Sequence, residues 1–594
     1  MIKLSDYIAK RLKEVYKIQN VFMVSGGGAM HLNNSFGKYI PYICNHHEQA
    51  SAICAEGYAR VNQQLAVVNV TTGPGGLNCL NGVFGQWTDS VPVLYISGQV
   101  KYSTTMASCP DIKLRQLGDQ EVDIISVVKP LTKYAVMVKD ANEIKYHLDK
   151  AIYEATNGRF GPVWLDIPMN IQASMIDEKK LKGFENPKIK EPKTNINKVI
   201  EKIQKSKRPL IIAGHGVRLS NTQQEFYKLI EKLKIPVVTT FNGLDLLETD
   251  NKYYIGRVGT VGQRAGNFTL QNADLVLCLG TRNNIRQVSY NWENFAKNSF
   301  KIVVDIDNNE LQKPLVKPDL SINCDLKIFI PLLNKSIKKV NDYSNWLDFC
   351  INLKNKYCFK NYQEIKQSKN IIEPYQFTYT LTKCLNENDI FVMANGSACV
   401  CSFQNAVIKK NQRYILNSGN ASMGYGLPAS IGACISSNKR NVICLEGDGS
   451  IMMNIQELET IKYNKLPIKV FIINNSGYSS IRQTQRNFFN GKMTGSGIDS
   501  GVSVPDFIKI GKAFGLKTKR IKFPKNMEKE IKEVLKSKEP ILCEVIVEKE
   551  YGFYPKLSAK KLPDGTMISP TLEDMYPFLD RKEFNKNIIG NNKK

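Results

Sequence analysis

The sequence lacks the features that would place the chain in or across a membrane. It has no tract of about 18 uninterrupted apolar residues, so nothing predicts a membrane-spanning helix. Its first twenty residues, MIKLSDYIAKRLKEVYKIQN, carry charges throughout, as an amphipathic helix does, and lack the apolar core of a signal peptide. We therefore expect a cytoplasmic protein with no membrane partner.

Clusters of cysteine and histidine are also missing. The 14 cysteines are scattered without a CxxC spacing, and the five histidines show no metal-ligand spacing apart from the adjacent pair His46 and His47. This pattern excludes a zinc site or a CxxC redox centre and favours reduced, mostly buried thiols. We read the two adjacent histidines as residues at the rim of a pocket, with His47 the closer to a substrate.

Arginine-rich patches with interleaved aromatic residues are absent too, although the formal net charge is +26. A charge of this size can indicate a nucleic-acid partner. Here the lysines are spread along the whole chain instead of forming one basic face. We expect no nucleic-acid partner.

Short apolar runs that end in Gly, Pro, Ser or Asp are abundant, and they alternate with helical patterns. This alternation is typical of parallel sheets covered by helices on both faces. The runs form three series, which polar, lysine-rich stretches separate near residues 177–197 and 335–369. The predicted fold class is α/β with three consecutive doubly wound parallel-sheet domains. We place these domains at residues 1–176, 190–340 and 370–550, with an irregular arm over a surface at residues 551–594.

The most informative segment is Gly447-Asp448-Gly449-Ser450, which follows an apolar strand and precedes a helical run. Glycines at the carboxyl end of a strand let backbone amides approach a phosphate. Asp448 offers a hard oxygen ligand, and Asn474-Asn475 end the next predicted strand. Because adjacent parallel strands end at the same edge of a sheet, these side chains can meet around one magnesium ion that also holds phosphate oxygens.

A GDG at the end of one strand and NN at the end of the next resemble the signature of thiamine-diphosphate enzymes. The resemblance implies that Asp448, the Asn475 side chain and the Gly477 carbonyl bind magnesium, while Asn474 secures the turn. The segments HHEQAS (46–51), AEGYAR (55–60) and TTGPGGLN (71–78) further resemble the pyrimidine-binding domain of acetolactate synthases.

Glu48 is the catalytic residue that this resemblance implies. Taken alone, Glu48 could simply cap a helix. In the family, the matching glutamate bonds N1′ of the aminopyrimidine and so promotes deprotonation of the thiazolium C2. Gln120, in LGDQEVDI, matches a second residue near the thiazolium, although Asp119 replaces the family's phenylalanine.

The family resemblance implies a larger set of residues in contact with thiamine diphosphate. In the N-terminal domain these are Gly26, His47, Thr72, Pro74 and Asn78. In the C-terminal domain they are Gly396, Met423, Gly447, Gly449, Ser450, Asn475, Gly477 and Tyr478. Met423 would prop the cofactor into its bent shape, although taken alone it would be core filler. Because the family holds one cofactor between two subunits, the resemblance also implies a homodimer at least, and a homotetramer as an alternative.

An FAD site in the central domain is a further implication of the family. The residues that match are Arg159, Gly259, Arg264, Asn267, Arg282, Arg286, Asp305 and Asp307. The alternative is a domain that keeps the fold without a flavin, as several relatives do.

Positions that choose the substrate depart from the acetolactate synthase pattern. Ser397, Ile481 and Thr484 fall in the predicted pocket, and Thr484 replaces the tryptophan of the family motif MVRQWQ. Met169 replaces a lysine and Val258 a histidine. A smaller pocket wall favours a bulkier carbonyl acceptor.

The sequence therefore predicts a carboligase that decarboxylates a 2-oxo acid such as pyruvate and transfers the acyl unit to a carbonyl acceptor. Two enzymatic alternatives remain, a hydrolase or lyase of a cyclic dione and a simple 2-oxo acid decarboxylase. A non-enzymatic alternative is an inactive, cofactor-binding partner subunit. The joint presence of Glu48, Asp448 and Asn475 argues against it.

Overall fold

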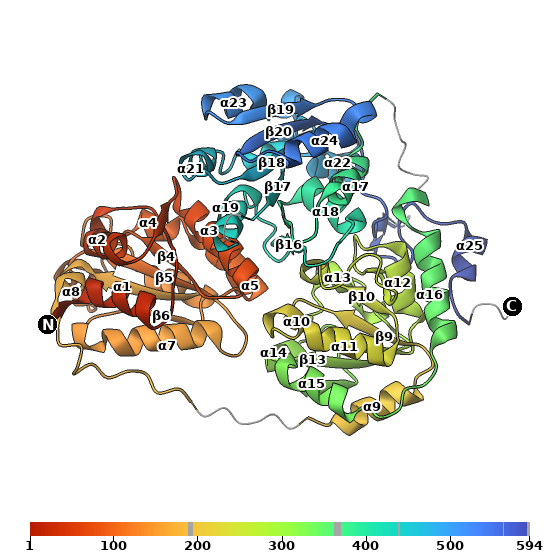
Figure 1. Ribbon diagram of the computed structural model, residues 1–594, viewed down its shortest axis with the longest axis horizontal. Coiled ribbons are helices and arrows are strands. Elements are labelled where there is room, and N and C mark those ends of the chain that lie inside the picture. The colour runs from red at the N-terminus through yellow and green to blue at the C-terminus, as the bar shows by residue number, and fades with distance from the viewer. Residues whose placement is uncertain (188–193, 362–369, 438–439, 562–563, 591–594) are drawn as a thin grey trace.

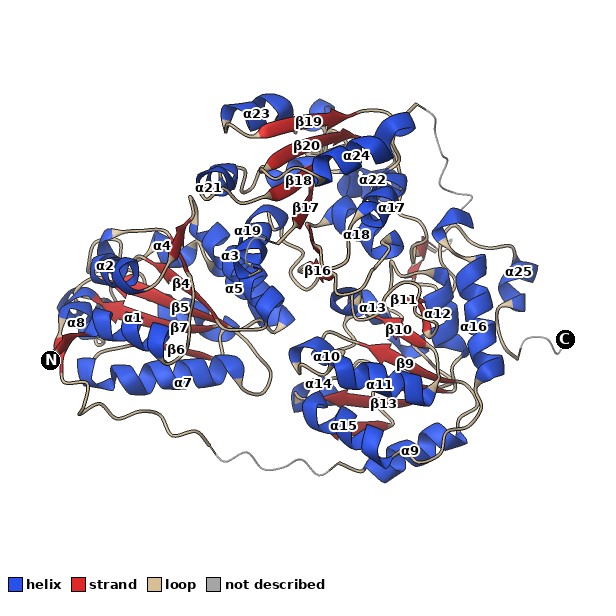
Figure 2. Ribbon diagram, viewed as in Figure 1, coloured by secondary structure: helices blue, strands red, loops and turns tan. Residues whose placement is uncertain are grey.

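Three six-stranded parallel sheets form the centres of three domains (Figure 1). The computed structural model describes residues 1–187, 194–361, 370–437, 440–561 and 564–590. Residues 188–193 of the predicted first linker lie outside these ranges. The predicted fold class is confirmed, since helices flank each sheet (Figure 2).

The N-terminal domain is built on a parallel sheet whose two faces are covered by helices. Its strands stand in the order β3 (Tyr42–Cys44), β2 (Val21–Met23), β4 (Ala66–Val70), β5 (Val93–Gln99), β7 (Val163–Pro168) and β6 (Tyr134–Met137). One face packs on α1 (Leu4–Glu14), α2 (Met30–Tyr39) and α7 (Ile144–Thr156). The other packs on α3 (Glu48–Asn62) and α5 (Leu80–Asp89). Because both faces are covered, β4, β5 and β7 are buried along their whole length, which explains their nearly continuous apolar sequences.

The C-terminal domain repeats this topology. Its strands stand in the order β16 (Arg413–Ile415), β15 (Ile390–Met393), β17 (Val442–Gly447), β18 (Ile468–Asn474), β20 (Ile541–Ile546) and β19 (Lys517–Ile521). Counted along the chain, both outer sheets run second, first, third, fourth, sixth, fifth. Their helices α17 (Pro374–Cys384), α18 (Gly396–Asn405) and α24 (Met527–Leu535) pack around one core.

The two outer domains of one chain pack against each other through α3 and α19 (Gly426–Ser436). Two glycines make this contact close. A Cβ on Gly57 would lie 2.1 Å from the Ala429 carbonyl oxygen, and one on Gly432 would lie 1.8 Å from the Cys54 carbonyl oxygen. Any side chain at either position would force the helices apart, so the placement of the two sheets depends on both glycines.

The middle domain has a different strand order. It runs β11 (Tyr254–Arg257), β10 (Val237–Thr239), β9 (Pro209–Ala213), β12 (Leu275–Leu279), β13 (Phe300–Asp305) and β14 (Leu320–Asn323). The direction in which strands are added therefore reverses between β9 and β12. In open α/β sheets, ligands bind outside the carboxyl ends of the strands at such a point.

The C-terminal arm returns to the middle domain and covers α12 (Arg264–Asn272) and α16 (Ser344–Lys356), as the dark blue segment in Figure 1 shows. Leu572 and Phe584, the latter on the short helix α25 (Arg581–Lys586), pack into the core beneath. The Asn272 side chain donates a 2.8 Å hydrogen bond to the Asn587 carbonyl oxygen. Across the described residues, no helix is both long and apolar enough to span a bilayer.

Candidate active site

The GDG and NN segments meet at the carboxyl ends of β17 and β18. The two strands are parallel neighbours, with Gly447 opposite Ile473. Asp448 begins α20 (Asp448–Ile451), and its Oδ2 accepts hydrogen bonds from the backbone N–H groups of Asn475 at 3.1 Å and Gly477 at 2.9 Å. The structure thus brings together the three residues that the sequence predicted as magnesium ligands.

The Asp448 carboxylate is buried, with 1% of its surface exposed. Burial raises its pKa to about 6, although the backbone N–H groups of Gly477, Gly449 and Ser476 act in the opposite direction. A divalent cation beside the carboxylate would compensate this buried charge. Among the described residues, no three His, Cys, Asp or Glu side chains gather at one point, so a metal here would rely on amide and carbonyl oxygens, which suit magnesium.

Gly449 and Ser450 shape the same edge of the sheet. A Cβ on Gly449 would lie 2.2 Å from the Tyr478 ring, so only glycine fits against that ring. Ser450 accepts a 2.9 Å hydrogen bond from the Gly424 N–H and so holds the segment that carries Met423. Met423 is partly exposed, as a residue that contacts a ligand would be.

The end of a third strand, β15, reaches this edge through Gly396 and Ser397. Gly396 has a φ of +59°, which favours glycine, and opens α18. The Ser397 hydroxyl contacts the hydroxyl of Tyr551, which lies 3.4 Å from Asn475 Nδ2. Tyr551 is buried and belongs to the segment after β20, where no motif pointed to it.

Glu48 occupies the first position of α3 in the N-terminal domain. His47 is the N-cap, and its Nδ1 accepts a 3.0 Å hydrogen bond from the Gln49 N–H. Because His47 caps the helix, the Glu48 carboxylate is available for another contact. Its Oε2 accepts a 2.9 Å hydrogen bond from the Asn78 side chain. Asn78 directly follows α4 (Pro74–Leu77), so the TTGPGGLN segment orients the predicted catalytic carboxylate.

The other residues predicted in this domain lie on the loops around that segment. Gly73 leaves no room for a side chain, since a Cβ there would lie 2.0 Å from the Gln120 carbonyl oxygen. Gln120 itself is exposed and has a φ of +58°. Thr72 donates a 3.0 Å hydrogen bond to the Gly98 carbonyl oxygen, and Gly26 packs closely on Thr71.

Glu457, which the sequence analysis missed, links the N-terminal and C-terminal domains of one chain. It lies on α21 (Glu457–Tyr463) of the C-terminal domain and is fully buried. Its carboxylate accepts hydrogen bonds from Asn45 Nδ2 at 2.8 Å and from the His46 N–H at 2.9 Å. The chain directly before Glu48 is thereby fixed to the helix that follows GDG.

A cavity of about 530 Å³ lies where the middle sheet reverses, between the N-terminal and middle domains. Its lining includes Arg159, Arg282 and Asp305 from the predicted flavin set. Arg159 donates hydrogen bonds to Asp307 at 2.9 Å and Glu310 at 2.8 Å. Burial raises the pKa of Asp305 to about 6.

The remaining predicted flavin residues do not line this cavity. Asn267 bonds both the N–H and the carbonyl of Gly259, and also the Leu572 carbonyl of the arm. Arg264 donates to the carbonyl oxygens of Met575 and Pro577. Arg286 lies 5.3 Å above the ring of Phe241, which does line the cavity.

Comparison with known proteins gives three matches to models of thiamine pyrophosphate enzymes. The N-terminal TPP binding domain matches residues 2–127, the central domain residues 196–333 and the C-terminal TPP binding domain residues 394–545. The matches include the whole middle sheet, whereas β6 and β7 of the N-terminal sheet and β15 of the C-terminal sheet lie outside them.

Among curated proteins, the chain is similar to large subunits of acetolactate synthase. It is 30% identical over 561 residues to that of Lactococcus lactis subsp. lactis (strain IL1403), covering 93% of this chain and 94% of that protein. The isozyme 2 large subunit of Escherichia coli (strain K12) is 29% identical over 566 residues, covering 94% and 97%. The probable large subunit of Methanocaldococcus jannaschii is 30% identical over 564 residues, covering 92% of each chain.

Proposed function

The chain belongs to the acetolactate synthase-like family of thiamine-diphosphate-dependent enzymes, and from this membership we propose that it decarboxylates pyruvate and transfers the acyl unit to a carbonyl acceptor. The observation that carries this proposal is the Asp448 carboxylate, buried and hydrogen-bonded to the Asn475–Gly477 turn at the ends of two parallel strands. When bound, thiamine diphosphate supplies a thiazolium that stores the electron pair left by decarboxylation.

Asp448, the Asn475 amide oxygen and the Gly477 carbonyl would hold magnesium, and the ion would hold the diphosphate. Burial raises the pKa of Asp448 because the charged carboxylate loses its contact with water. A magnesium ion beside the carboxylate would supply the counter-charge that burial makes necessary. Gly447, Gly449 and Ser450 place the amino end of α20 at the same edge of the sheet.

Glu48 would hold a proton at N1′ of the aminopyrimidine. The geometry supports this role, because Asn78 donates a hydrogen bond to one oxygen of the Glu48 carboxylate. The amino terminus of α3 is capped by His47 and not by Glu48.

We propose that two copies of the chain complete each site. Large apolar side chains are exposed on two helices that directly follow predicted cofactor residues, α5 after Asn78 and α22 after Tyr478. Phe84 and Trp87 on α5 are 40% and 38% exposed, and Ile481 and Phe488 on α22 (Ser479–Phe488) are 47% and 52% exposed. Exposed apolar groups of this size around a site mark an interface, and a second copy would cover them.

The acceptor is proposed to be larger than a second pyruvate. Thr484 and Ile481 both lie on the exposed side of α22, where the family has tryptophan in place of Thr484. A keto-sugar nucleotide is the type of compound that such a site would admit.

The cavity of the middle domain is proposed to hold FAD. Its place at the strand reversal suits a dinucleotide, Asp305 suits ribose hydroxyls and Arg282 suits a pyrophosphate. The alternative is the same fold without a flavin, and the absorption spectrum of the released ligand separates the two.

The experiment that tests the proposed function is a donor and acceptor screen with the purified protein, thiamine diphosphate and magnesium. Pyruvate consumption that rises when a larger carbonyl compound is added, with a branched product, is the expected result. Aldehyde release without a new carbon–carbon bond would identify a simple decarboxylase. Cleavage of a cyclic dione would identify the hydrolase or lyase alternative.

A further inference from the structure

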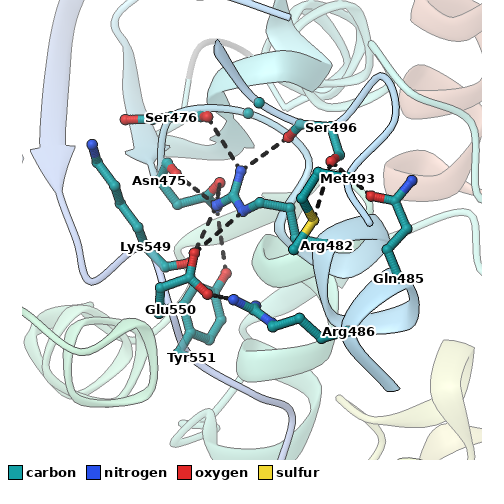
Figure 3. Close-up of polar contacts among 12 residues, drawn as sticks. Asn475, Ser476, Arg482, Gln485, Arg486, Met493, Ser496, Lys549, Glu550 and Tyr551 are labelled. Carbon is teal, nitrogen blue, oxygen red and sulfur yellow. Dashed lines mark hydrogen bonds and ion pairs between the residues drawn. The ribbon is translucent and has the colours of Figure 1, made fainter. Parts of the chain in front are cut away.

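A buried arginine, Arg482, lies behind the turn that carries the predicted magnesium ligands. It is on α22, the helix that follows this turn, and only 7% of its surface is exposed. Its Nη1 donates to the carbonyl oxygens of Ser476 at 3.2 Å and Ser496 at 3.0 Å. Its Nη2 donates to the carbonyl oxygens of Asn475 at 2.8 Å and Lys549 at 3.2 Å (Figure 3).

Arg482 depends on these carbonyl oxygens for its stabilisation. Its closest carboxylate contact among the described ion pairs is Glu550, 3.8 Å from Nε, and that Nε makes no hydrogen bond within the described part of the chain. A buried cation is unfavourable unless its donors are satisfied. The planar guanidinium satisfies several carbonyls at fixed angles, which a lysine cannot do.

The same peptide group connects Arg482 with Asp448. In a trans peptide the carbonyl and the next N–H point in opposite directions. The Ser476 carbonyl faces Arg482, and the Gly477 N–H at the other end of that peptide donates to Asp448 Oδ2 at 2.9 Å. The peptide dipole therefore lies between a buried cation and a buried carboxylate.

The turn needs such support because its backbone is unusual. Ser476 has a φ of +62° and Gly477 a φ of +126°. A non-glycine residue in the left-handed region is unfavourable and persists only where its surroundings hold it. Arg482 Nη2 also lies 3.4 Å from the Asn475 side-chain oxygen, so one guanidinium contacts both the backbone and the side chain of a predicted ligand.

We propose that Arg482 is a positioning residue, which sets the Asn475–Gly477 turn so that its amide and carbonyl oxygens bind magnesium together with Asp448. This inference rests on the proposed function. Lys549 contacts Arg482, and Tyr551 contacts Asn475, so the segment after β20 contributes to the same arrangement.

The test measures how much magnesium is needed for thiamine diphosphate to bind, by equilibrium dialysis with the full-length protein. Arg482→Gln removes both the charge and the planar guanidinium. Arg482→Lys keeps the charge but loses the planar guanidinium. Arg486→Gln is the matched control, since Arg486 lies one turn further along α22 and pairs with Glu550. We expect the half-saturating magnesium concentration to rise about 10-fold or more in Arg482→Gln and by an intermediate factor in Arg482→Lys. The control should stay within about 2-fold, because surface ion pairs contribute little.

Measurements of kcat distinguish a role in positioning the turn from a role in supporting the whole domain. If Arg482 positions the turn, saturating magnesium restores kcat in Arg482→Lys while the half-saturating concentration stays high. Wild-type magnesium dependence in folded Arg482→Gln or Arg482→Lys would overturn the inference. Loss of the fold in both variants would overturn it as well, since Arg482 would then support the domain. Absence of magnesium-dependent binding in the wild-type protein would overturn the proposed function and this inference with it.

Discussion

The Asn78 side-chain amide donates a 2.9 Å hydrogen bond to the Glu48 carboxylate. Glu48 begins α3, and Asn78 follows α4, which starts at the proline of the TTGPGGLN segment. This bond connects the HHEQAS and TTGPGGLN segments, and it fixes the direction of the carboxylate that we propose for proton transfer.

Glu48→Gln should keep the fold and the binding of thiamine diphosphate, because glutamine still accepts the Asn78 hydrogen bond through its amide oxygen. It removes the group that can hold a proton at N1′. We expect hydrogen–deuterium exchange at thiazolium C2 to slow by about 100-fold or more. Asn78→Ala is the companion variant and should slow exchange less. An unchanged exchange rate in Glu48→Gln would leave Glu48 with a structural role only.

A mixture of Glu48→Gln and Asp448→Ala chains should recover activity if each site combines two copies. In a mixed dimer, one site then has both residues intact and the other has neither. Random exchange of subunits at equal amounts should restore about a quarter of the wild-type activity. No recovery after proven subunit exchange would show that Glu48 and Asp448 serve one site within the same chain.

Asp245 should be a major source of stability where the three domains meet. Its carboxylate pairs with Arg413 of the C-terminal domain at 2.6 Å and with Arg218 at 3.1 Å, and Arg413 also bonds the carbonyl of Arg60 in the N-terminal domain. Asp245→Asn leaves two buried cations without their counter-charge. We expect a loss of about 3–5 kcal/mol at pH 7, seen as a lower melting temperature. The exposed Asp250→Asn is the control and should melt like wild type.

The pH dependence of this loss follows from the pKa of Asp245. Burial acts to raise it, but Arg218 and Arg413 outweigh burial and lower it to about 2 from an ordinary value of 3.8. Because the pKa of Asp245 is lower in the folded protein, its charged carboxylate stabilises the fold at pH values above 3.8. This stabilisation is lost as the pH falls toward 2 and the carboxylate is protonated. The melting difference between wild type and Asp245→Asn should therefore be full above pH 4 and narrow below it. A difference that does not change with pH would contradict the ion-pair explanation.

Thr484→Trp should test the assignment of the acceptor pocket. Thr484 is exposed on α22, and its hydroxyl bonds only the Ser480 carbonyl of its own helix among the described contacts, so added bulk would project from the helix surface. We expect kcat/KM for a large carbonyl acceptor to fall roughly 10-fold and that for a second pyruvate to change less. Equal losses for both acceptors would place Thr484 outside the pocket.

The sheets and the contact between Asp448 and the Asn475–Gly477 turn could be predicted from the sequence because their signals are local. Strands buried on both faces appear as apolar runs, and GDG and NN stand directly at the ends of two such runs. Asp448, Asn475 and Gly477 meet because parallel neighbours end at one edge. The HHEQAS segment pointed to Glu48, and the structure adds the hydrogen bond from Asn78 that orients its carboxylate.

Residues that act across long sequence distances could not be predicted in this way. Glu457 contacts Asn45, and Tyr551 contacts Ser397, through packing that no spacing in the sequence reports. The contacts of Arg264 and Asn267 with the arm are of the same long-range kind. The sequence predicted both as flavin residues, and the structure adds that they bond the backbone of residues 572–577, whose position depends on the folded middle domain.

The most direct test of the account is ¹³C NMR of the purified protein with labelled pyruvate, thiamine diphosphate, magnesium and a larger carbonyl acceptor. The account predicts release of labelled carbon dioxide and a product with a new carbon–carbon bond to the labelled acyl unit. Both signals should disappear when magnesium is removed or when Asp448→Ala replaces the wild type. Unchanged pyruvate under these conditions, or equal product from Asp448→Ala, would contradict it.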